Sequence, residues 1–226
     1  MLLNRPWCFS LLVPIHNLQG YALSRRCRLS WRNCLRAHAM QVCGPALAAT
    51  TSWPRPPGDQ PAYSPVVELI PRPYGHPDVV TLTLEVQAHY SELYGGPGDE
   101  SFVEVADFEA PTGHFVVGYL RGVPVAMGGW RRLGDRPGLP SANAAEIKRM
   151  YVAPCARGRG LSRVVLAELE TSARAAGIDW LVLETGRPQT SAIELYRSSG
   201  YTDVDGKPYG HYVDEPDAVH LGKSLS

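Results

Sequence analysis

The segment Arg157-Gly158-Arg159-Gly160-Leu161-Ser162 lies between an apolar, strand-like run at residues 147–152 and an amphipathic helical pattern. The first N–H groups of a helix have no partner within the helix, so they suit the oxygens of a bound phosphate. Glycines let a ligand approach the backbone closely, and arginines add positive charge that pairs with phosphate. The segment therefore predicts a site for a ligand that carries a diphosphate.

Two common phosphate-binding motifs do not fit this segment. A Walker loop requires Lys and then Ser or Thr directly after its last glycine, whereas Leu161 follows Gly160. A Rossmann site requires a third glycine at the position that Arg163 occupies. A structural alternative stays open, in which Gly158 and Gly160 only shape a turn and Ser162 caps the following helix.

Residues 1–62 differ sharply in composition from the rest of the chain. Residues 1–58 contain seven arginines and four of the five cysteines but no Asp or Glu, and they end in a Pro-rich stretch. This shift predicts an Arg- and Pro-rich, disordered extension at residues 1–62. A transit peptide, a secretory signal, a basic nucleic-acid-binding arm and translation from upstream of the true start, with Met40 as an internal candidate, stay open as alternatives.

Residues 63–226 are enough for a single domain with one core. This part holds no apolar stretch long enough to cross a bilayer and no histidine pair at ligand spacing, so we expect neither a membrane partner nor a metal. Its one cysteine, Cys155, argues against a disulfide framework and is typical of the reducing cytoplasm. We expect no nucleic-acid partner, and a monomer and a homodimer both stay open.

Strand-like and helix-like patterns alternate along this domain. Helical spacing of apolar residues predicts helices at 78–94, with Asp78 as the N-cap, and at 161–176, where Val164 and Ala176 widen the apolar stripe. A shorter helix is expected at 191–199. Strands are expected at 66–70, 114–120, 123–130, 146–152 and 180–184, with edge strands at 201–204 and 219–221. The fold class is α/β or α+β, a mixed central sheet flanked by helices.

Four segments of this domain follow one another in a specific order. They are Glu146-Ile147-Lys148-Arg149-Met150-Tyr151-Val152-x-Pro154, Arg157-x-x-Gly160-x-Ser162, Leu181-Val182-Leu183-Glu184-Thr185-Gly186 and Ala192-Ile193-Glu194-Leu195-Tyr196-Arg197-Ser198-Ser199-Gly200-Tyr201. Together they resemble the fourth strand, pyrophosphate loop, fifth strand and final helix of the GNAT superfamily of N-acetyltransferases. The resemblance covers nearly all of residues 63–226.

This resemblance implies acetyl-CoA as a co-substrate and no metal. In the superfamily the fourth and fifth strands splay apart and hold the pantetheine arm between them, which assigns backbone binding to Met150, Tyr151 and Val152. The pyrophosphate falls to the loop, with Arg157, Gly158, Arg159, Gly160, Leu161 and Ser162 as the binding residues. Ser162 departs from the pattern, because the superfamily usually has Gly or Ala there.

The resemblance also implies three catalytic residues. Tyr196 matches the helix tyrosine that protonates the departing thiolate, although an ordinary core aromatic is the alternative. Glu146 and Glu184 are candidates for the base that takes the amine proton. Each carboxylate has an alternative role in an ion pair, and strand alternation places Glu146 on the same face as Lys148, Met150 and Val152.

The function implied is transfer of an acetyl group to a primary amine of a small molecule or peptide, by direct attack in a ternary complex. The alternative is a coenzyme A-binding module of the same fold without catalysis. Residues 90–98 and 206–212 are the expected walls of the acceptor pocket. The excess of acidic residues after residue 58, 22 Asp and Glu against 15 Lys and Arg, favours a cationic amine.

Overall fold

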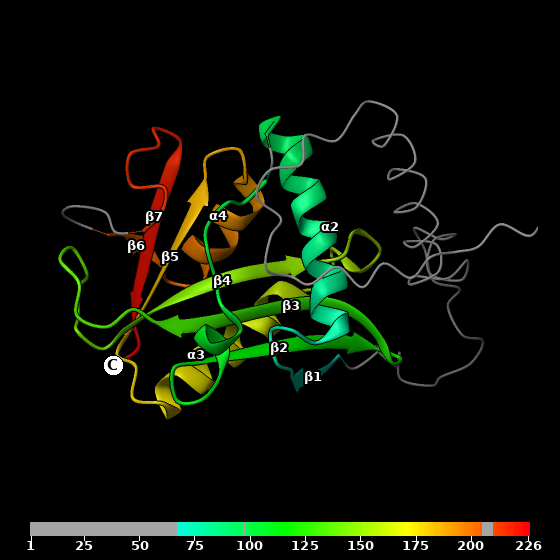
Figure 1. Ribbon diagram of the computed structural model, residues 1–226, viewed down its shortest axis with the longest axis horizontal. Coiled ribbons are helices and arrows are strands. Elements are labelled where there is room, and N and C mark those ends of the chain that lie inside the picture. Colours follow the sequence, from blue (N-terminus) through cyan, green and yellow to red (C-terminus); the bar gives the residue numbers. More distant parts are fainter. Residues whose placement is uncertain (1–66, 97, 205–209) are drawn as a thin grey trace, which may run out of the picture. The chain divides into compact units, whose positions relative to one another are not determined.

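The computed structural model of this chain describes residues 67–96, 98–204 and 210–226. Seven strands of this part form one sheet in the order β1-β2-β3-β4-β5-β7-β6 (Figure 1). The strands are β1 (Glu68–Pro71), β2 (Gly113–Leu120), β3 (Val123–Arg132), β4 (Ala144–Val152), β5 (Trp180–Gly186), β6 (Thr202–Asp203) and β7 (Ala218–Ser224). The helices are α2 (Pro77–Tyr94), α3 (Leu161–Ala175), α4 (Thr190–Ser198) and the short 3-10 helices η1 (Val105–Phe108) and η2 (Pro154–Ala156).

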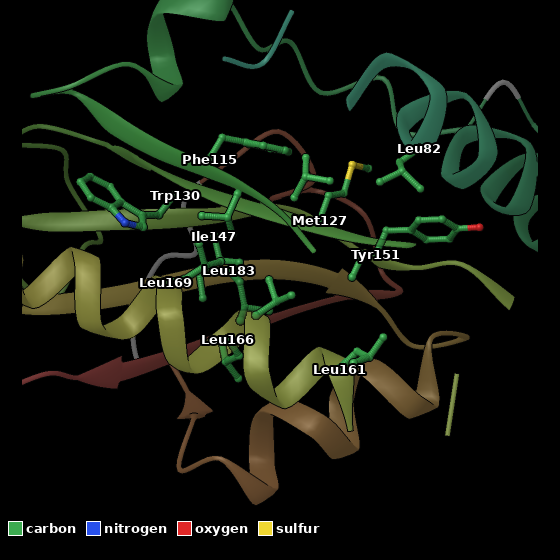
Figure 2. Close-up of a cluster of buried hydrophobic side chains, with 14 of the residues drawn as sticks. Leu82, Phe115, Met127, Trp130, Ile147, Tyr151, Leu161, Leu166, Leu169 and Leu183 are labelled. Atoms are coloured by element: carbon green, nitrogen blue, oxygen red, sulfur yellow. The ribbon is translucent and has the colours of Figure 1, made fainter. Parts of the chain in front are cut away.

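Helices α2 and α3 cover opposite faces of the sheet, and their contacts with β3 follow its alternation. Thr83 of α2 lies 4.0 Å from the sulfur of Met127. Trp130, three residues further along β3, donates from Nε1 to the hydroxyl of Ser172 in α3 at 3.0 Å. In Figure 2, Leu82 reaches the sheet from α2 and the leucines of α3 reach it from the other side. The predicted mixed sheet with flanking helices is confirmed.

The apolar stripe of α3 is buried as predicted at i, i+4 positions. Val165, Leu169 and Ala173 are completely buried, because they face the sheet from the middle of the helix. Val164 is 41% exposed, so the prediction that it widens this stripe is wrong. A second correction concerns the start of α2, where His76 and not Asp78 is the N-cap, since the His76 Nδ1 accepts from the Asp78 N–H at 3.2 Å.

Strands β4 and β5 are the parallel pair of the sheet, and they stay paired over a short distance. Ala144 to Glu146 lie opposite Trp180 to Val182, and the pairing ends there. Beyond this point the two strands diverge, as the resemblance implied. Strand β7 pairs with β5 along its whole length, from Trp180↔Ser224 to Gly186↔Ala218, and with β6 on its other side. The prediction of an edge strand at 219–221 is therefore wrong, since β7 is interior.

A bulge interrupts β4 beside its partner β3. The pairs Met127↔Tyr151 and Gly129↔Lys148 leave one extra residue on β4, and Arg149 adopts a left-handed φ of 58°. Simple alternation along β4, which we expected from the sequence, therefore ends at the bulge. Around the bulge, six consecutive residues, 147–152, line one cavity.

Two predictions concern residues that the structure does not describe. The extension predicted at residues 1–62 lies wholly outside the described residues, and so do residues 206–209 of the predicted acceptor-pocket wall. No helix in the described ranges is long and apolar enough to cross a bilayer.

Candidate active site

A cavity of about 840 Å³ lies where β4 and β5 diverge, and we call it the main cavity. Its walls are the end of α2 and the segment after it, residues 147–152, the loop of residues 156–162, the end of β5, the start of α4 and the segment before β7. Parts of the chain far apart in sequence thus meet around one space. Of the candidate site residues, all line the cavity except Arg159 and Glu146.

The loop at residues 157–162, named here the Gly-Arg loop, leads directly into α3. Gly160 is the N-cap residue in a left-handed conformation, with φ 75°, and Gly158 has φ 74°. Both conformations favour glycine, because a Cβ atom strains this region of backbone space. Since α3 starts at Leu161, its first N–H groups have no partner within the helix. The loop therefore presents unpaired donors at the cavity wall, as expected for a phosphate site.

The polar side chains of the Gly-Arg loop differ in whether they line the main cavity. Arg157 lines the cavity while its Nε donates to the carbonyl of Val152 at 3.0 Å. Arg159 does not line it, since its Nη2 lies 3.5 Å from the carbonyl oxygen of Cys155. Ser162 lines the cavity as the second residue of α3 and forms no cap, so the alternative of a serine cap is wrong.

Tyr196 of α4 lines the cavity with its side chain almost completely buried. Its ring meets that of Tyr201 edge-on, at 5.5 Å between centroids. Burial, with a smaller contribution from nearby Tyr90, raises the pKa of Tyr196 well above its ordinary value. Burial likewise raises the pKa of Tyr90 to about 12. Tyr196 therefore keeps its proton through the neutral pH range and is able to donate it.

Glu184 lies near the end of β5, and several polar groups surround its carboxylate. The N–H groups of His211 and Tyr212 donate to it at 3.2 and 3.1 Å, and Nε2 of His220 lies 3.1 Å away. Lys148 Nζ lies at 3.7 Å. Burial raises the pKa of Glu184, but the bond to His220, the charge of Lys148 and the two backbone donors outweigh it, so the pKa lies below its ordinary value.

Glu146 lies in the paired part of β4, behind the cavity wall. Its carboxylate is 2% exposed and lies 3.0 Å from Arg131 and 2.9 Å from Lys148. Arg131 also pairs with Asp107 at 2.8 Å. This geometry is that of an ion pair that orients Lys148. A role for Glu146 in proton transfer stays a prediction.

A network that the sequence did not reveal surrounds Tyr212. Its hydroxyl donates to Oδ1 of Asp99 at 2.8 Å and accepts from the N–H of Glu100 at 2.9 Å. Asp99 in turn pairs with the buried guanidinium of Arg149, and Tyr212 donates its N–H to Glu184. We call Asp99, Arg149, Glu184 and Tyr212 the Tyr212 cluster; all four line the main cavity.

Two further contacts fix the Tyr212 cluster in place. Gln87 of α2 binds both the N–H and the carbonyl of Asp99, each at 2.8 Å. Gly210 packs so closely on Glu184 that a Cβ there would lie 2.2 Å from its carboxylate. The charge of Arg149, with bonds from Ser101 and Tyr212, holds the pKa of Asp99 below its ordinary value, although burial opposes this. No sequence motif marks these partners, because they lie on separate elements.

Comparison with known proteins agrees with this geometry. Residues 83–201 match the model of the acetyltransferase (GNAT) family. The chain belongs to this family. An IAA acetyltransferase of Azospirillum brasilense is 33% identical over 147 residues, which are 65% of this chain and 90% of the relative. The family that the motifs resembled is thereby confirmed.

Solved structures share the fold. A protein described as an acyl-CoA N-acyltransferase of Klebsiella pneumoniae superposes with a TM-score of 0.55 at 26% identity, covering 71% of this chain and 98% of that one. The PaiA N-acetyltransferase of Thermoplasma acidophilum, solved with coenzyme A, gives a TM-score of 0.51 at 15% identity, covering 70% and 99%. At that low identity the second likeness shows the fold alone.

Proposed function

We propose that this protein is an N-acetyltransferase that moves an acetyl group from acetyl-CoA to a primary amine of a small molecule or peptide. The observation that carries the proposal is the main cavity itself. It joins the Gly-Arg loop, the opening between β4 and β5, and the buried hydroxyl-bearing side chain of Tyr196. Acetyl-CoA needs a phosphate site, a channel for an extended arm and a proton donor near the thioester, and this cavity has candidates for all three.

The assignment of binding groups follows the chemistry of the lining. The backbone of Gly158, Gly160, Leu161 and Ser162, with the guanidinium of Arg157, is suited to the pyrophosphate. Met150, Tyr151 and Val152 lie on the part of β4 that no longer pairs with β5. The backbone on this side is suited to the amides of the pantetheine arm, as an added strand would be. Arg159 contributes its backbone at most, since its side chain points elsewhere.

The reaction forms a C–N bond and breaks a C–S bond. The ammonium group of the acceptor first loses a proton to water. The neutral amine nitrogen then attacks the thioester carbonyl, and backbone N–H groups of β4 stabilise the negative charge on its oxygen. The thiolate leaves and takes the proton of Tyr196, whose raised pKa keeps it available. The nitrogen releases its extra proton to water, and Tyr196 is reprotonated from solvent.

Glu184 acts in this scheme through its charge. Because its pKa is lowered, it stays ionised at neutral pH and stabilises the positive charge that develops on the attacking nitrogen. A carboxylate with a lowered pKa is a weak base, so the nitrogen releases its proton to water and not to Glu184. Glu146 serves it indirectly, by holding Lys148 beside it.

The acceptor is a cationic amine. Four carboxylates line the main cavity beside the aromatic rings of Tyr90, Tyr94 and Tyr212: Asp99, Glu184, Glu215 and Asp217. Against these stand Arg157 at the Gly-Arg loop and Lys148 and Arg149, which are each already paired with a carboxylate. A surplus of negative charge around aromatic faces attracts ammonium groups.

The test uses the full chain with acetyl-CoA and a panel of polyamines, amino sugars and peptides with lysine or free N-termini. IAA is included because the A. brasilense relative carries that name. We expect thiol release together with a product heavier by one acetyl group in mass spectrometry. Binding of acetyl-CoA without thiol release on any acceptor would support a non-catalytic coenzyme A-binding module instead.

We further propose that residues 63–226 form the catalytic domain. All candidate site residues fall between Glu146 and Tyr196 in the sequence. A protein truncated to residues 63–226 is expected to keep the kcat/KM of the full chain within about two-fold, because changes far from a site usually have small effects on it. A larger loss would assign a role to residues 1–62.

A further inference from the structure

Two contacts join opposite walls of the main cavity. One wall is the end of α2 with the segment after it, and the other is the end of β5 with the segment before β7. Across this space Tyr212 donates its hydroxyl proton to Asp99, as described above. The other contact is made by Tyr94, the last residue of α2. The acetyl-transfer scheme above does not use the contact that Tyr94 makes.

Tyr94 reaches both the end of β5 and the start of α4. Its hydroxyl accepts from Nε2 of Gln189, the N-cap residue of α4, at 2.8 Å. A Cβ atom on Gly186, the last residue of β5, would collide with the same hydroxyl oxygen. The phenol therefore packs directly on the backbone of β5, and a larger residue at position 186 would displace it. We call Tyr94, Gly186 and Gln189 the Tyr94 bridge.

The Tyr94 bridge lies at the exposed rim of the cavity, next to the reacting groups of the proposed mechanism. Tyr94 is 43% exposed, whereas Tyr196 is only 5% exposed. Between them lies Tyr90, whose ring centroid is 6.3 Å from that of Tyr94 and which is near Tyr196. Gly186 follows Glu184 by two residues, so both face the same side of the sheet. The bridge therefore borders the space in which Tyr196 and Glu184 act.

The rim between the two contacts is continuous on the side of β7. Gly186 pairs with Ala218, the first residue of β7. The segment before β7, residues 210–217, leads from there back to Tyr212 and so to the other contact. A passage into the main cavity is therefore bounded on three sides, by the Tyr94 bridge, by this segment and by the contact at Tyr212.

We propose that the acceptor amine enters through this passage and that Tyr94 limits the width of the acceptor. The proposal rests on the proposed function, since it concerns the acceptor of that reaction. A primary amine at the end of an unbranched chain brings only methylene groups past the phenol. An amine on a ring carbon brings a bulkier group, which collides with the phenol while Gln189 and Gly186 hold it in place. Overcrowding of packed atoms is unfavourable, so Tyr94 makes the protein selective for unbranched amines.

The experiment measures kcat/KM of the full chain for hexylamine and for cyclohexylamine, with saturating acetyl-CoA. The two amines have the same charge and the same number of carbon atoms, so they differ mainly in width. The unmodified protein is expected to prefer hexylamine by about 30-fold, the usual free-energy cost of overcrowding expressed as a ratio. Thiol release gives the rates, and mass spectrometry identifies each acetylated amine.

Two variants open the passage in different ways. Tyr94→Ala removes the phenol, so the preference should fall to about three-fold. The rate with cyclohexylamine should rise above that of the unmodified protein, a gain that damage to the fold would not produce. Gly186→Ala keeps the phenol but displaces it, and should lower the preference below about 10-fold. The backbone of Gly186 lies outside the left-handed region, so alanine suits it.

Leu93→Ala is the matched control. Leu93 precedes Tyr94 and lines the same cavity, but it takes no part in the Tyr94 bridge. The preference of this variant should stay near about 30-fold, because changes outside the bridge leave the phenol in place. Thermal melting verifies that each variant is folded.

The outcomes separate this inference from the proposed function. Equal rates with the two amines in the unmodified protein, or an unchanged preference in Tyr94→Ala or in Gly186→Ala, overturn the role of Tyr94 and leave the acetyltransferase proposal intact. Acetylation of neither amine while another primary amine is acetylated has the same meaning. An equal loss of preference in Leu93→Ala also overturns it, because any widening of the cavity would then suffice. No thiol release with any amine overturns the proposed function, and this inference with it.

Discussion

The Gly-Arg loop and the Tyr212 cluster line the same main cavity but are built in different ways. The loop is one continuous segment of six residues, and it acts through backbone groups at the start of α3. The Tyr212 cluster joins side chains from the segment after α2, from β4, from β5 and from the segment before β7. Its bonds connect Arg149 to Asp99 across 50 residues of sequence and Tyr212 to Asp99 across 113.

This difference separates a site that depends on local backbone geometry from one that depends on the identity of each side chain. Backbone donors need only glycines and a helix, so many sequences satisfy the cofactor end. The Tyr212 cluster depends on the identity of each side chain, because its charges and hydroxyls complement one another. We infer that acceptor choice resides in the cluster, and the following variants test the separation.

Tyr196→Phe should have the largest effect, since it removes the proton donor and touches neither end of the cavity. We expect kcat to fall about 100-fold, with little change in the affinity for acetyl-CoA. Steady-state kinetics and calorimetry measure the two quantities. Tyr201→Phe is the matched control, because its buried hydroxyl lies outside the main cavity, and it should keep kcat. An undiminished rate in Tyr196→Phe would remove this residue from the mechanism.

Asp99→Asn should break the Tyr212 cluster and spare the Gly-Arg loop. The variant leaves the buried Arg149 without its counter-ion, so the free energy of unfolding should fall by about 2 kcal/mol. This loss is smaller than that for a fully buried ion pair, because Asp99 is partly exposed. The KM for the acceptor should rise about 10-fold as the wall at Tyr212 loosens. Denaturant titration and kinetics measure both effects. A comparable loss of acetyl-CoA affinity would contradict the separation of the two ends.

Glu184→Gln sharpens the comparison through pH. The folded-state pKa of Glu184 is lowered, so its ionisation stabilises the fold above the unfolded pKa of 4.5. That contribution is lost as the pH falls through the folded-state value. The unmodified protein should therefore exceed Glu184→Gln in stability by about 1 kcal/mol at pH 7, and the gap should close below pH 4.5. A gap that stays constant from pH 7 to pH 3 would show that the charge of Glu184 is not responsible.

Ser162→Gly should have the smallest effect. The serine makes no cap and its hydroxyl only lines the main cavity, so restoring the small residue usual in the family changes little. We expect the KM for acetyl-CoA to change by less than about three-fold, within the range of one weak hydrogen bond. A tenfold rise would mean that the hydroxyl contacts a phosphate directly.

The sequence predicted the elements well and their ends less well. The hairpin of β2 and β3 turns at Arg121 and Gly122, with φ of 52° and 78°, because this pair suits a tight turn. The cap of α2 was misplaced since His76, an uncommon cap, lies directly before Pro77. The strand at 219–221 was taken for an edge because its short apolar pattern does not reveal how many neighbours it has.

The candidate site was predictable where one motif contains its residues. The Gly-Arg loop and Tyr196 line the cavity as the motifs implied. The two carboxylates differ in a way that alternation did not predict, since Glu184 lines the cavity and Glu146 pairs behind it. The cause is the β4–β5 pairing, which still holds Glu146 opposite Val182 and ends before Glu184.

The sequence by itself determined the family, the order of strands and helices, and the cofactor loop. Each of these depends on local spacing: apolar periodicity, glycines at left-handed positions and a helix start that leaves N–H groups unpaired. Only the tertiary structure decided the partners of Asp99, Arg149, Glu184 and Tyr212. Ion pairs and hydrogen bonds between distant segments depend on distances of a few ångströms that no spacing along the chain specifies.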